Sequence, residues 1–281
     1  MERQYIDMVH EIYPSLSKKE KLVADYVIQN MTNVLRMSSR ELKDAVNVSE
    51  PTVFRFCQAL GFTGFSDFKI SMAQQVTSYM DYFLTDESSE TKLQTLIRRT
   101  LESEIKIIDT TIRMIDYKLL EKTAKRVLNA RRICLYGTGS SAESCNDARR
   151  KFSRLGINAW SYSEINEVLS ILGTFDKQDM LIAVSHSGTT QDIENVLRFA
   201  FNRKIYTVLL TAYPNTRMVQ YVNTVLRTYA REIVDKLIAG ASRISQFAMM
   251  DALFIAVGSL LRNSELQSVE QTLHEIKEIL K

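Results

Sequence analysis

Cysteine, metal-ligand spacing and long apolar runs are all scarce in this 281-residue chain. Its three cysteines, Cys57, Cys134 and Cys145, lack the spacing of a zinc site, and two of them lie in apolar segments. We therefore expect buried free thiols, with no disulfide framework and no bound metal or cofactor. No uncharged run approaches the roughly 20 residues that cross a bilayer, and no apolar signal segment follows the amino terminus. These absences predict a cytoplasmic protein with no membrane partner.

The chain also lacks a large excess of charge of either sign, since its net charge is only +3. This slight basic excess neither requires nor excludes a nucleic-acid partner. The length favours two domains, and the pattern divides the chain accordingly. The first part is helical in pattern, whereas strands and helices alternate after Arg132. We expect an all-α domain over 1–80, a polar linker over 81–91 and an α/β domain over 92–281.

Two short helices in the first domain have the dimensions of a helix-turn-helix. The first begins after Ser38, which forms a predicted capping box with Glu41. Ser17 and Glu20 repeat this pattern at the start of the preceding helix. The second helix of the pair is predicted over 50–60, and its proline lies in the first turn, where the missing N–H costs nothing.

This second helix would enter the major groove. Its predicted buried stripe is Val53, Phe56, Cys57 and Leu60, and its predicted outward residues are Glu50, Thr52, Arg55 and Gln58. Ser49, Thr52 and Arg55 share the leading face, where arginine pairs with guanine and threonine contacts a thymine methyl group or a phosphate. Candidate phosphate contacts are Lys18, Lys19, Lys43 and Lys69. Acids balance bases over 1–80, so a helical bundle without DNA is the alternative.

In the second domain, an apolar run over 180–184 ends abruptly in Ser185-His186-Ser187-Gly188-Thr189-Thr190. The run is typical of a strand buried on both faces, and a helix is predicted over 191–202. Strand, turn and helix in this order leave free backbone N–H groups and the positive helix end at one place, where an anion can bind. Hydroxyl groups would add donors, and the glycine would let the backbone approach closely. The alternative is an ordinary turn whose Ser and Thr cap the helix.

The alternating pattern predicts a parallel sheet with helices on both faces. Its strands are predicted over 133–136, 159–162, 180–185, 206–211 and 225–229. A long amphipathic helix over 93–115 precedes the sheet, and we expect its apolar stripe to pack against the sheet. The alternative is a coiled coil, for which the run is short. A second helix, over 119–130, leads into the first strand.

The segment after the first predicted strand, 137–142, also fits the dinucleotide-binding pattern G-x-G-x-x-G/A. Glu164 would then be the acid that binds the ribose. However, Glu164 lies beyond the second strand rather than at its tip, and a dinucleotide domain does not explain the 185–190 loop. The sequence therefore disfavours a nicotinamide cofactor.

Three segments of the first domain, 16–27, 48–57 and 60–69, resemble the DNA-binding domain of the RpiR family of bacterial transcriptional regulators. In that family this domain is fused to a sugar isomerase (SIS) domain, whose phosphate loop resembles Ser185-His186-Ser187-Gly188-Thr189-Thr190. The resemblance covers nearly the whole chain. It implies a multidomain fold, in which an all-α helix-turn-helix domain is followed by a three-layer α/β domain with a five-stranded parallel sheet.

The resemblance also implies which residues bind a ligand. Ser140 or Ser141, with Ser185, Ser187 and Thr190, would hold the phosphate of a phosphosugar, and His186 would contribute mainly its backbone. The segment after the last strand would help to close the pocket, with Arg243 as a candidate polar contact. Amino-sugar, hexose and pentose phosphates are all candidate effectors.

Two functions follow from these features. A phosphosugar pocket joined to a DNA reader predicts a regulator of sugar catabolism genes, without turnover. It would act as a homodimer or dimer of dimers on an inverted-repeat operator, with subunit contacts through the 93–115 helix and a final helix over 266–280. The alternative is a sugar-phosphate isomerase with a helical accessory domain. That reaction needs a base, and Glu232 is the candidate, because no histidine lies between 187 and 273.

Overall fold

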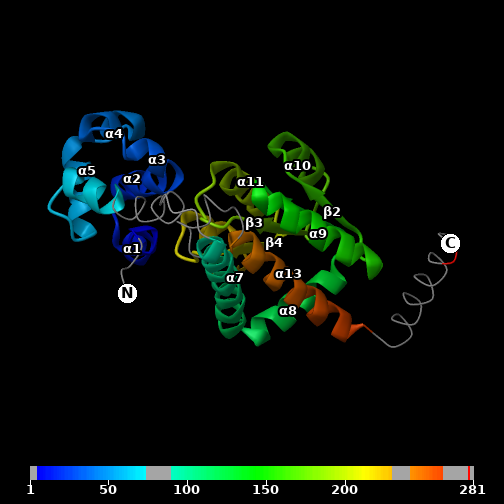
Figure 1. The fold of residues 1–281 in the computed structure, drawn as a ribbon. Coiled ribbons are helices and arrows are strands. Elements are labelled where there is room, and N and C mark those ends of the chain that lie inside the picture. The colour runs from blue at the N-terminus through cyan, green and yellow to red at the C-terminus, as the bar shows by residue number, and fades with distance from the viewer. Residues whose placement is uncertain (1–4, 74–89, 230–240, 262–277, 279–281) are drawn as a thin grey trace. The chain divides into compact units, whose positions relative to one another are not determined.

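A computed structural model describes residues 5–73, 90–229, 241–261 and 278 of the chain (Figure 1). These residues form two compact units. One consists mainly of 1–103, and the other consists mainly of 104–214, 218–231 and 239–281. The 81–91 linker, Glu232 and the final helix predicted over 266–280 lie wholly or almost wholly outside the described residues.

The first unit is helical throughout its described length (Figure 1). Its elements are α1 (Tyr5–Ile12), η1 (Tyr13–Ser15), α2 (Lys18–Gln29), α3 (Met31–Val34), α4 (Ser39–Val46), α5 (Glu50–Ala59) and a helix over 65–73. Both predicted capping boxes are confirmed, since Ser17 and Ser38 exchange hydrogen bonds with Glu20 and Glu41. Asn47 ends α4 with a φ of 54°, in the left-handed region that asparagine tolerates. The chain thereby turns from α4 into α5.

The core of the helical unit lies among α2, α4, α5 and the 65–73 helix. The predicted stripe of α5 is confirmed, because Val53, Phe56, Cys57 and Leu60 are all buried. Phe56 meets Phe68 edge to face, with ring centroids 6.0 Å apart. Burial raises the pKa of the Cys57 thiol to about 12, so this cysteine is an inert core residue at neutral pH.

The second unit contains the predicted five-stranded parallel sheet. Its strands are β1 (Ile133–Gly137), β2 (Ala159–Tyr162), β3 (Met180–Val184), β4 (Tyr206–Thr211) and β5 (Thr224–Arg227), in the order β2-β1-β3-β4-β5. Every pairing is parallel. The central strands β1 and β3 are buried at every position, as continuous apolar runs predict.

Helices cover both faces of this sheet and make three layers (Figure 1). On one face, α8 (Tyr117–Asn129), α9 (Ser140–Arg154) and α13 (Ala241–Leu260) pack on alternate strand residues such as Leu135 and Ile182. On the other face, α10 (Ile165–Leu172) and α11 (Gln191–Asn202) pack on Cys134, Tyr136 and Ala183, together with η2 (Arg217–Tyr221).

The helix α13 is the one described segment that is long and apolar enough to cross a membrane by length and composition. Its sequence is interrupted by Arg243 and Asp251, which is why counting uncharged runs did not select it. In the structure α13 packs against α8 and α9 and contributes Met250, Leu253 and Val257 to the core. These contacts are those of a core helix, and core helices can also have the length and apolar composition of a membrane span.

The long helix α7 (Glu90–Arg113) corrects one prediction. From 97 to 112 the apolar stripe does not pack against the sheet, because Ile97, Leu101, Ile105, Ile108 and Ile112 are all exposed. Among the described residues of the stripe, only Ile115, just beyond α7, packs against the core of the sheet domain. The side of α7 that is buried carries Ile107 and Thr111 instead. The Thr111 hydroxyl donates to the carbonyl of Tyr229 at 3.4 Å and accepts from its N–H at 3.2 Å. These contacts turn the stripe outward, which the pattern of apolar residues alone did not reveal.

Candidate functional site

The order of the strands places a topological switch point at the carboxyl edge of the sheet. The chain passes from β1 to β2 on one side, whereas β3 lies on the other side of β1. The helices that follow β1 and β3 therefore diverge to opposite faces, and ligands bind at such a switch point. Gly137 is paired with Val184 at this edge. The register thus brings the 138–141 turn next to the 185–190 loop, as the sequence analysis proposed.

Hydroxyl groups of the 185–190 loop are ordered by one another. The Ser187 and Thr189 hydroxyls are 3.0 Å apart, and the Thr189 N–H donates to the Ser187 oxygen at 3.3 Å. Ser185 is buried and its hydroxyl donates to Thr190 at 3.4 Å. Gly188 has a φ of 64°, a conformation that side chains disfavour. The loop is therefore preformed, with several hydroxyls in a small volume.

Thr190 occupies the N-cap position of α11, but its side chain makes no capping hydrogen bond to the described first turn. The alternative in which the hydroxyls of this loop serve only as helix caps therefore fails at the N-cap itself. The N–H groups of that first turn and the positive end of the helix are therefore available to an anion at the switch point.

The backbone of His186 fixes the loop to the end of β4. Its carbonyl accepts from the Ala212 N–H at 3.2 Å and from the Thr211 hydroxyl at 3.1 Å. Its ring meets the Tyr213 ring edge to face at 5.7 Å between centroids. The position of the loop is thus set by the neighbouring strand.

The turn after β1 is constrained by close packing. A Cβ atom on Gly137 would lie 2.8 Å from the backbone oxygen of Ser141, so glycine is required there. Ser141 is buried, and its hydroxyl accepts from the Gln246 side chain of α13 at 3.0 Å. Ser140 is exposed in the first turn of α9. The two serines that the sequence could not tell apart therefore differ, since only Ser140 presents its side chain to solvent.

Arg243 lies half-buried in the first turn of α13, close in sequence to Gln246. The segment that was expected to close the pocket, 230–240, lies outside the described residues together with Glu232. Among the residues that the structure describes, no three His, Cys, Asp or Glu side chains are grouped as metal ligands.

On the helical unit, α5 presents a second candidate site. We define its reading face as the exposed residues Pro51, Phe54, Arg55 and Gln58. The prediction that Thr52 faces outward is wrong, because Thr52 is only 1% exposed. Thr52 lies at the border of the buried face of α5, and α2 packs across α5. Phe54 was missed by the sequence analysis, although its spacing from Glu50 and Gln58 places it on the same side of the helix.

Thr52 instead positions its neighbours. Its hydroxyl lies 2.8 Å from that of Ser49 and accepts from the Arg55 guanidinium at 3.4 Å. Ser49 occupies the N-cap position of α5, without a side-chain capping bond to the described residues of that helix. Arg55 also pairs with Glu20 of α2, with its Nε 3.5 Å from the carboxylate. The arginine that was expected to read bases is thus held at both sides.

The candidate phosphate contacts fall into two groups. Lys18 and Lys19 are exposed in the first turn of α2. Lys43 pairs with Asp44 at 3.5 Å, and the Lys69 ammonium donates to the Met37 carbonyl at 2.8 Å. Lys69 therefore has a structural role in joining two helical segments.

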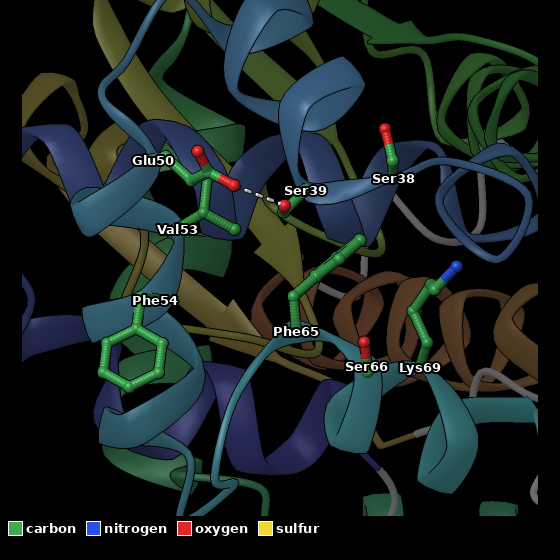
Figure 2. Close-up of a pocket in the computed structure, with 8 residues that line it drawn as sticks. All are labelled: Ser38, Ser39, Glu50, Val53, Phe54, Phe65, Ser66 and Lys69. Atoms are coloured by element: carbon green, nitrogen blue, oxygen red, sulfur yellow. Dashed lines mark hydrogen bonds between the residues drawn. The ribbon is translucent and has the colours of Figure 1, made fainter.

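A hollow of about 400 Å³ is lined in part by Phe54 of the reading face. Figure 2 shows the residues that line it. Val53, Phe54 and Phe65 provide its apolar wall. Its polar rim is formed by Ser38, Ser39, Glu50, Ser66 and Lys69. Within this rim the Ser39 hydroxyl donates to Glu50 at 2.7 Å, which joins the starts of α4 and α5 (Figure 2).

Comparison with known proteins identifies both units. The model of the helix-turn-helix domain of the rpiR family matches residues 3–79, and the SIS domain model matches residues 127–256. An uncharacterized HTH-type transcriptional regulator of Caldanaerobacter subterraneus subsp. tengcongensis is 29% identical over 265 residues, which cover 94% of each chain. The regulator HexR of Escherichia coli is 26% identical over 267 residues, covering 95% of this chain and 90% of HexR.

Solved structures share the fold. The Vibrio vulnificus NanR protein, complexed with ManNAc-6P, has a TM-score of 0.62 at 23% identity, with 98% of each chain covered. The sugar isomerase domain of an RpiR transcription factor from Sphaerobacter thermophilus has a TM-score of 0.57 at 19% identity. This match covers 65% of the present chain and 98% of that domain.

Proposed function

Because the chain belongs to the RpiR family of helix-turn-helix transcriptional regulators, we propose that a phosphosugar bound at the carboxyl edge of its sheet controls its binding to DNA. The regulated genes would be those of sugar catabolism. Membership of the family rests on two different domain matches in the expected order and on full-length relatives that are named transcriptional regulators.

The observation that supports the phosphosugar site best is the 185–190 loop at the switch point. It combines a preformed cluster of hydroxyls with an uncapped N-terminus of α11, and both features suit a phosphate dianion. Ser185, Ser187 and Thr190 would bind the phosphate from this loop, and Ser140 would bind it from the facing turn. Ser141 would hold α9 against α13, and Arg243 would contact the sugar from the start of α13. NanR, which shares the fold, binds ManNAc-6P, so amino-sugar phosphates are the first compounds to test.

The reading face of α5 would enter the major groove of an inverted-repeat operator. Arg55 is the proposed base-reading cation, with Ser49 beside it, and Thr52 would act by orienting both. Lys18 and Lys19 would contact phosphates, because they are exposed near the start of α2.

An inverted repeat requires two copies of this reading face, which a dimer would supply. We place the dimer interface on the exposed stripe of α7. The residues Ile97, Leu101, Ile105, Ile108 and Ile112 form one apolar face, and Ile105 is 66% exposed. Ile97 and Leu101 at one end of the stripe are four residues apart, as are Ile108 and Ile112 at the other end. The stripe can therefore pack against an antiparallel copy of itself. Exposed apolar stripes of this kind mark protein interfaces.

The proposed site acts without turnover. Relatives that match nearly the whole chain are named as regulators, and the helix-turn-helix domain points to regulation. A sugar-phosphate isomerase with Glu232 as its base is the second candidate, since isomerases share the SIS fold. Product formation from a sugar phosphate that is lost in Glu232→Gln would establish it.

The test is thermal unfolding of the full chain against a panel of sugar phosphates, each paired with its unphosphorylated sugar. A ligand present at 100 times its Kd stabilises by about 2.7 kcal/mol, which raises the Tm by several degrees. We expect one phosphorylated sugar to stabilise and its parent sugar to be silent. The double variant Ser185→Ala, Ser187→Ala should lose this shift, whereas Arg55→Ala should keep it and lose affinity for DNA. An unchanged shift in the double serine variant would remove the loop from the site.

A further inference from the structure

The reading face of α5 carries one large apolar side chain. Phe54 is 46% exposed, whereas its neighbours on that face are Pro51, Arg55 and Gln58. One side of the ring lies next to Gly64, since a Cβ atom built on that glycine would be 3.6 Å from the Phe54 Cε2 atom. Gly64 follows α5 in the connection to the 65–73 helix. Because this glycine has no side chain, the ring can lie close to its backbone. The ring also borders the hollow shown in Figure 2.

An exposed phenylalanine on a helix that enters the major groove has one apolar partner there. Thymine alone presents a methyl group on the groove edge, whereas the other bases present hydrogen-bond donors and acceptors. The adjacent Arg55 offers the complementary polar contact, since a guanidinium pairs with guanine. We propose that Phe54 contacts the 5-methyl group of a thymine in the operator and thereby specifies that base pair. This assignment rests on the proposed reading of DNA by α5.

Polar groups surround Phe54 on both sides. Arg55 and Gln58 lie next to it on the helix, and the hollow that its ring borders has a rim of serines, Glu50 and Lys69. The other apolar residues of the hollow, Val53 and Phe65, are buried, so Phe54 is its one exposed large apolar side chain. An interface with another protein has an apolar centre of several large side chains, whereas one exposed ring fits a base edge that is polar around a single methyl group. The observations therefore favour DNA as the occupant over a second protein surface.

The experiment isolates the methyl group. The full chain is used to select its best duplex from a random-sequence DNA pool, and each thymine of that duplex is then replaced singly by deoxyuridine, which lacks only the 5-methyl group. At one thymine per half-site we expect the wild-type chain to bind about fourfold more weakly, the equivalent of one buried methyl group. Phe54→Ala should bind the thymine duplex more weakly and should not distinguish thymine from uracil at that position.

Two further variants keep the result decisive. Phe54→Leu retains part of the apolar contact and should discriminate to an intermediate degree, so it decides the question if Phe54→Ala binds no DNA. Ile70→Ala removes an apolar side chain that is 59% exposed on the neighbouring helix, and it should discriminate as the wild type does. Thermal unfolding of each variant verifies that the fold is intact.

The outcomes separate two failures. If no duplex is enriched above the starting pool, α5 does not read DNA and the proposed function fails together with this assignment. If a duplex is bound but uracil is tolerated everywhere, or if Phe54→Ala keeps the full discrimination, only the role of Phe54 is overturned. A change of oligomeric mass in Phe54→Ala with discrimination unchanged would place the ring in a subunit contact instead.

Discussion

At the scale of a single residue, the hydroxyl of Tyr136 is a buried polar group without a hydrogen-bond partner among the described residues. Tyr136 is fully buried in β1, and none of the described residues forms a hydrogen bond with its hydroxyl. Burial, with the charges of Asp192 and Glu164, raises its pKa to about 12, so the hydroxyl stays protonated at neutral pH. An unsatisfied buried donor costs free energy that a phenylalanine would not.

Tyr136→Phe should therefore leave the free energy of unfolding unchanged or raise it by up to about 1 kcal/mol. Tyr206→Phe is the matched control, because the Tyr206 hydroxyl lies 2.8 Å from that of Thr224, and its loss should cost about 1 kcal/mol. Urea unfolding of both variants measures the difference. A loss of stability in Tyr136→Phe equal to that of the control would mean that the hydroxyl has a partner after all.

A second prediction concerns the carboxylate that holds Arg55. Hydrogen bonds from Ser17 keep the pKa of Glu20 below its ordinary value, so Glu20 is charged and competes with DNA for the guanidinium. Glu20→Gln keeps the shape of the capping box and removes the charge. DNA affinity should rise by about two- to fivefold at low salt, the magnitude of an exposed ion pair, and the gain should shrink as salt is added.

The control for this prediction is Glu41→Gln, which makes the same change in the capping box of α4. Fluorescence anisotropy with a labelled duplex measures both variants. Equal gains would show that only the overall charge of the domain had changed, and the competition between Glu20 and DNA would be refuted.

At the scale of elements, local sequence signals correctly predicted where helices and strands begin. They did not predict which side chains at the border between the buried and exposed faces of a helix are buried. The capping boxes at Ser17 and Ser38 and the apolar run of β3 depend on neighbouring residues, and all three appear where the sequence placed them. Thr52 and the α7 stripe were misplaced, because the burial of each depends on which element packs beside it. The composition of the 185–190 loop revealed it as a candidate site. The strand order that places this loop at the switch point could not be predicted from the loop itself.

The amino edge of the sheet depends on one buried carboxylate. Asp179 precedes β3, is completely buried, and accepts hydrogen bonds from the guanidinium groups of Arg131 and Arg132 at 2.7–3.1 Å. Burial alone would raise its pKa, but the hydrogen bonds from the two arginines outweigh burial and lower it well below the usual range. The Asp176 N–H donates a further hydrogen bond at 2.9 Å.

Asp179→Asn should cost on the order of 3 kcal/mol of unfolding free energy at pH 7, because Arg132 loses its carboxylate and Arg131 keeps only the half-exposed Asp176. The contribution of a carboxylate with a lowered pKa is complete above its unfolded value of about 3.9 and is lost as the pH falls toward the folded value. The difference between wild type and variant should thus be constant from pH 7 to about pH 5 and should narrow progressively below about pH 4. Asp176→Asn, whose side chain is half exposed, should cost less than about 1 kcal/mol. A difference that is constant to pH 2 would contradict the assignment.

At the scale of the whole molecule, the proposed inverted-repeat operator needs two reading helices, and the exposed stripe of α7 is our candidate for the contact that pairs them. Ile105→Glu places a charge at the centre of the stripe, so it should convert the proposed dimer to a monomer of half the mass without unfolding the chain, since Ile105 is exposed. Ile255→Glu is the matched control, because Ile255 is equally exposed on α13 and should leave the mass unchanged.

The loss of the dimer has a consequence for DNA that distinguishes this interface from a contact without function. A dimer binds the second half-site as an intramolecular step, so its affinity for the full operator should exceed that of the monomeric variant by on the order of a hundredfold. Affinity for a single half-site should be the same in both, because the reading face of α5 is untouched. Light scattering gives the masses, and anisotropy with full-site and half-site duplexes gives the affinities. If Ile105→Glu stays dimeric, the stripe is not the interface; if it becomes monomeric and still binds the full operator as the wild type does, the two readers are not coupled through α7.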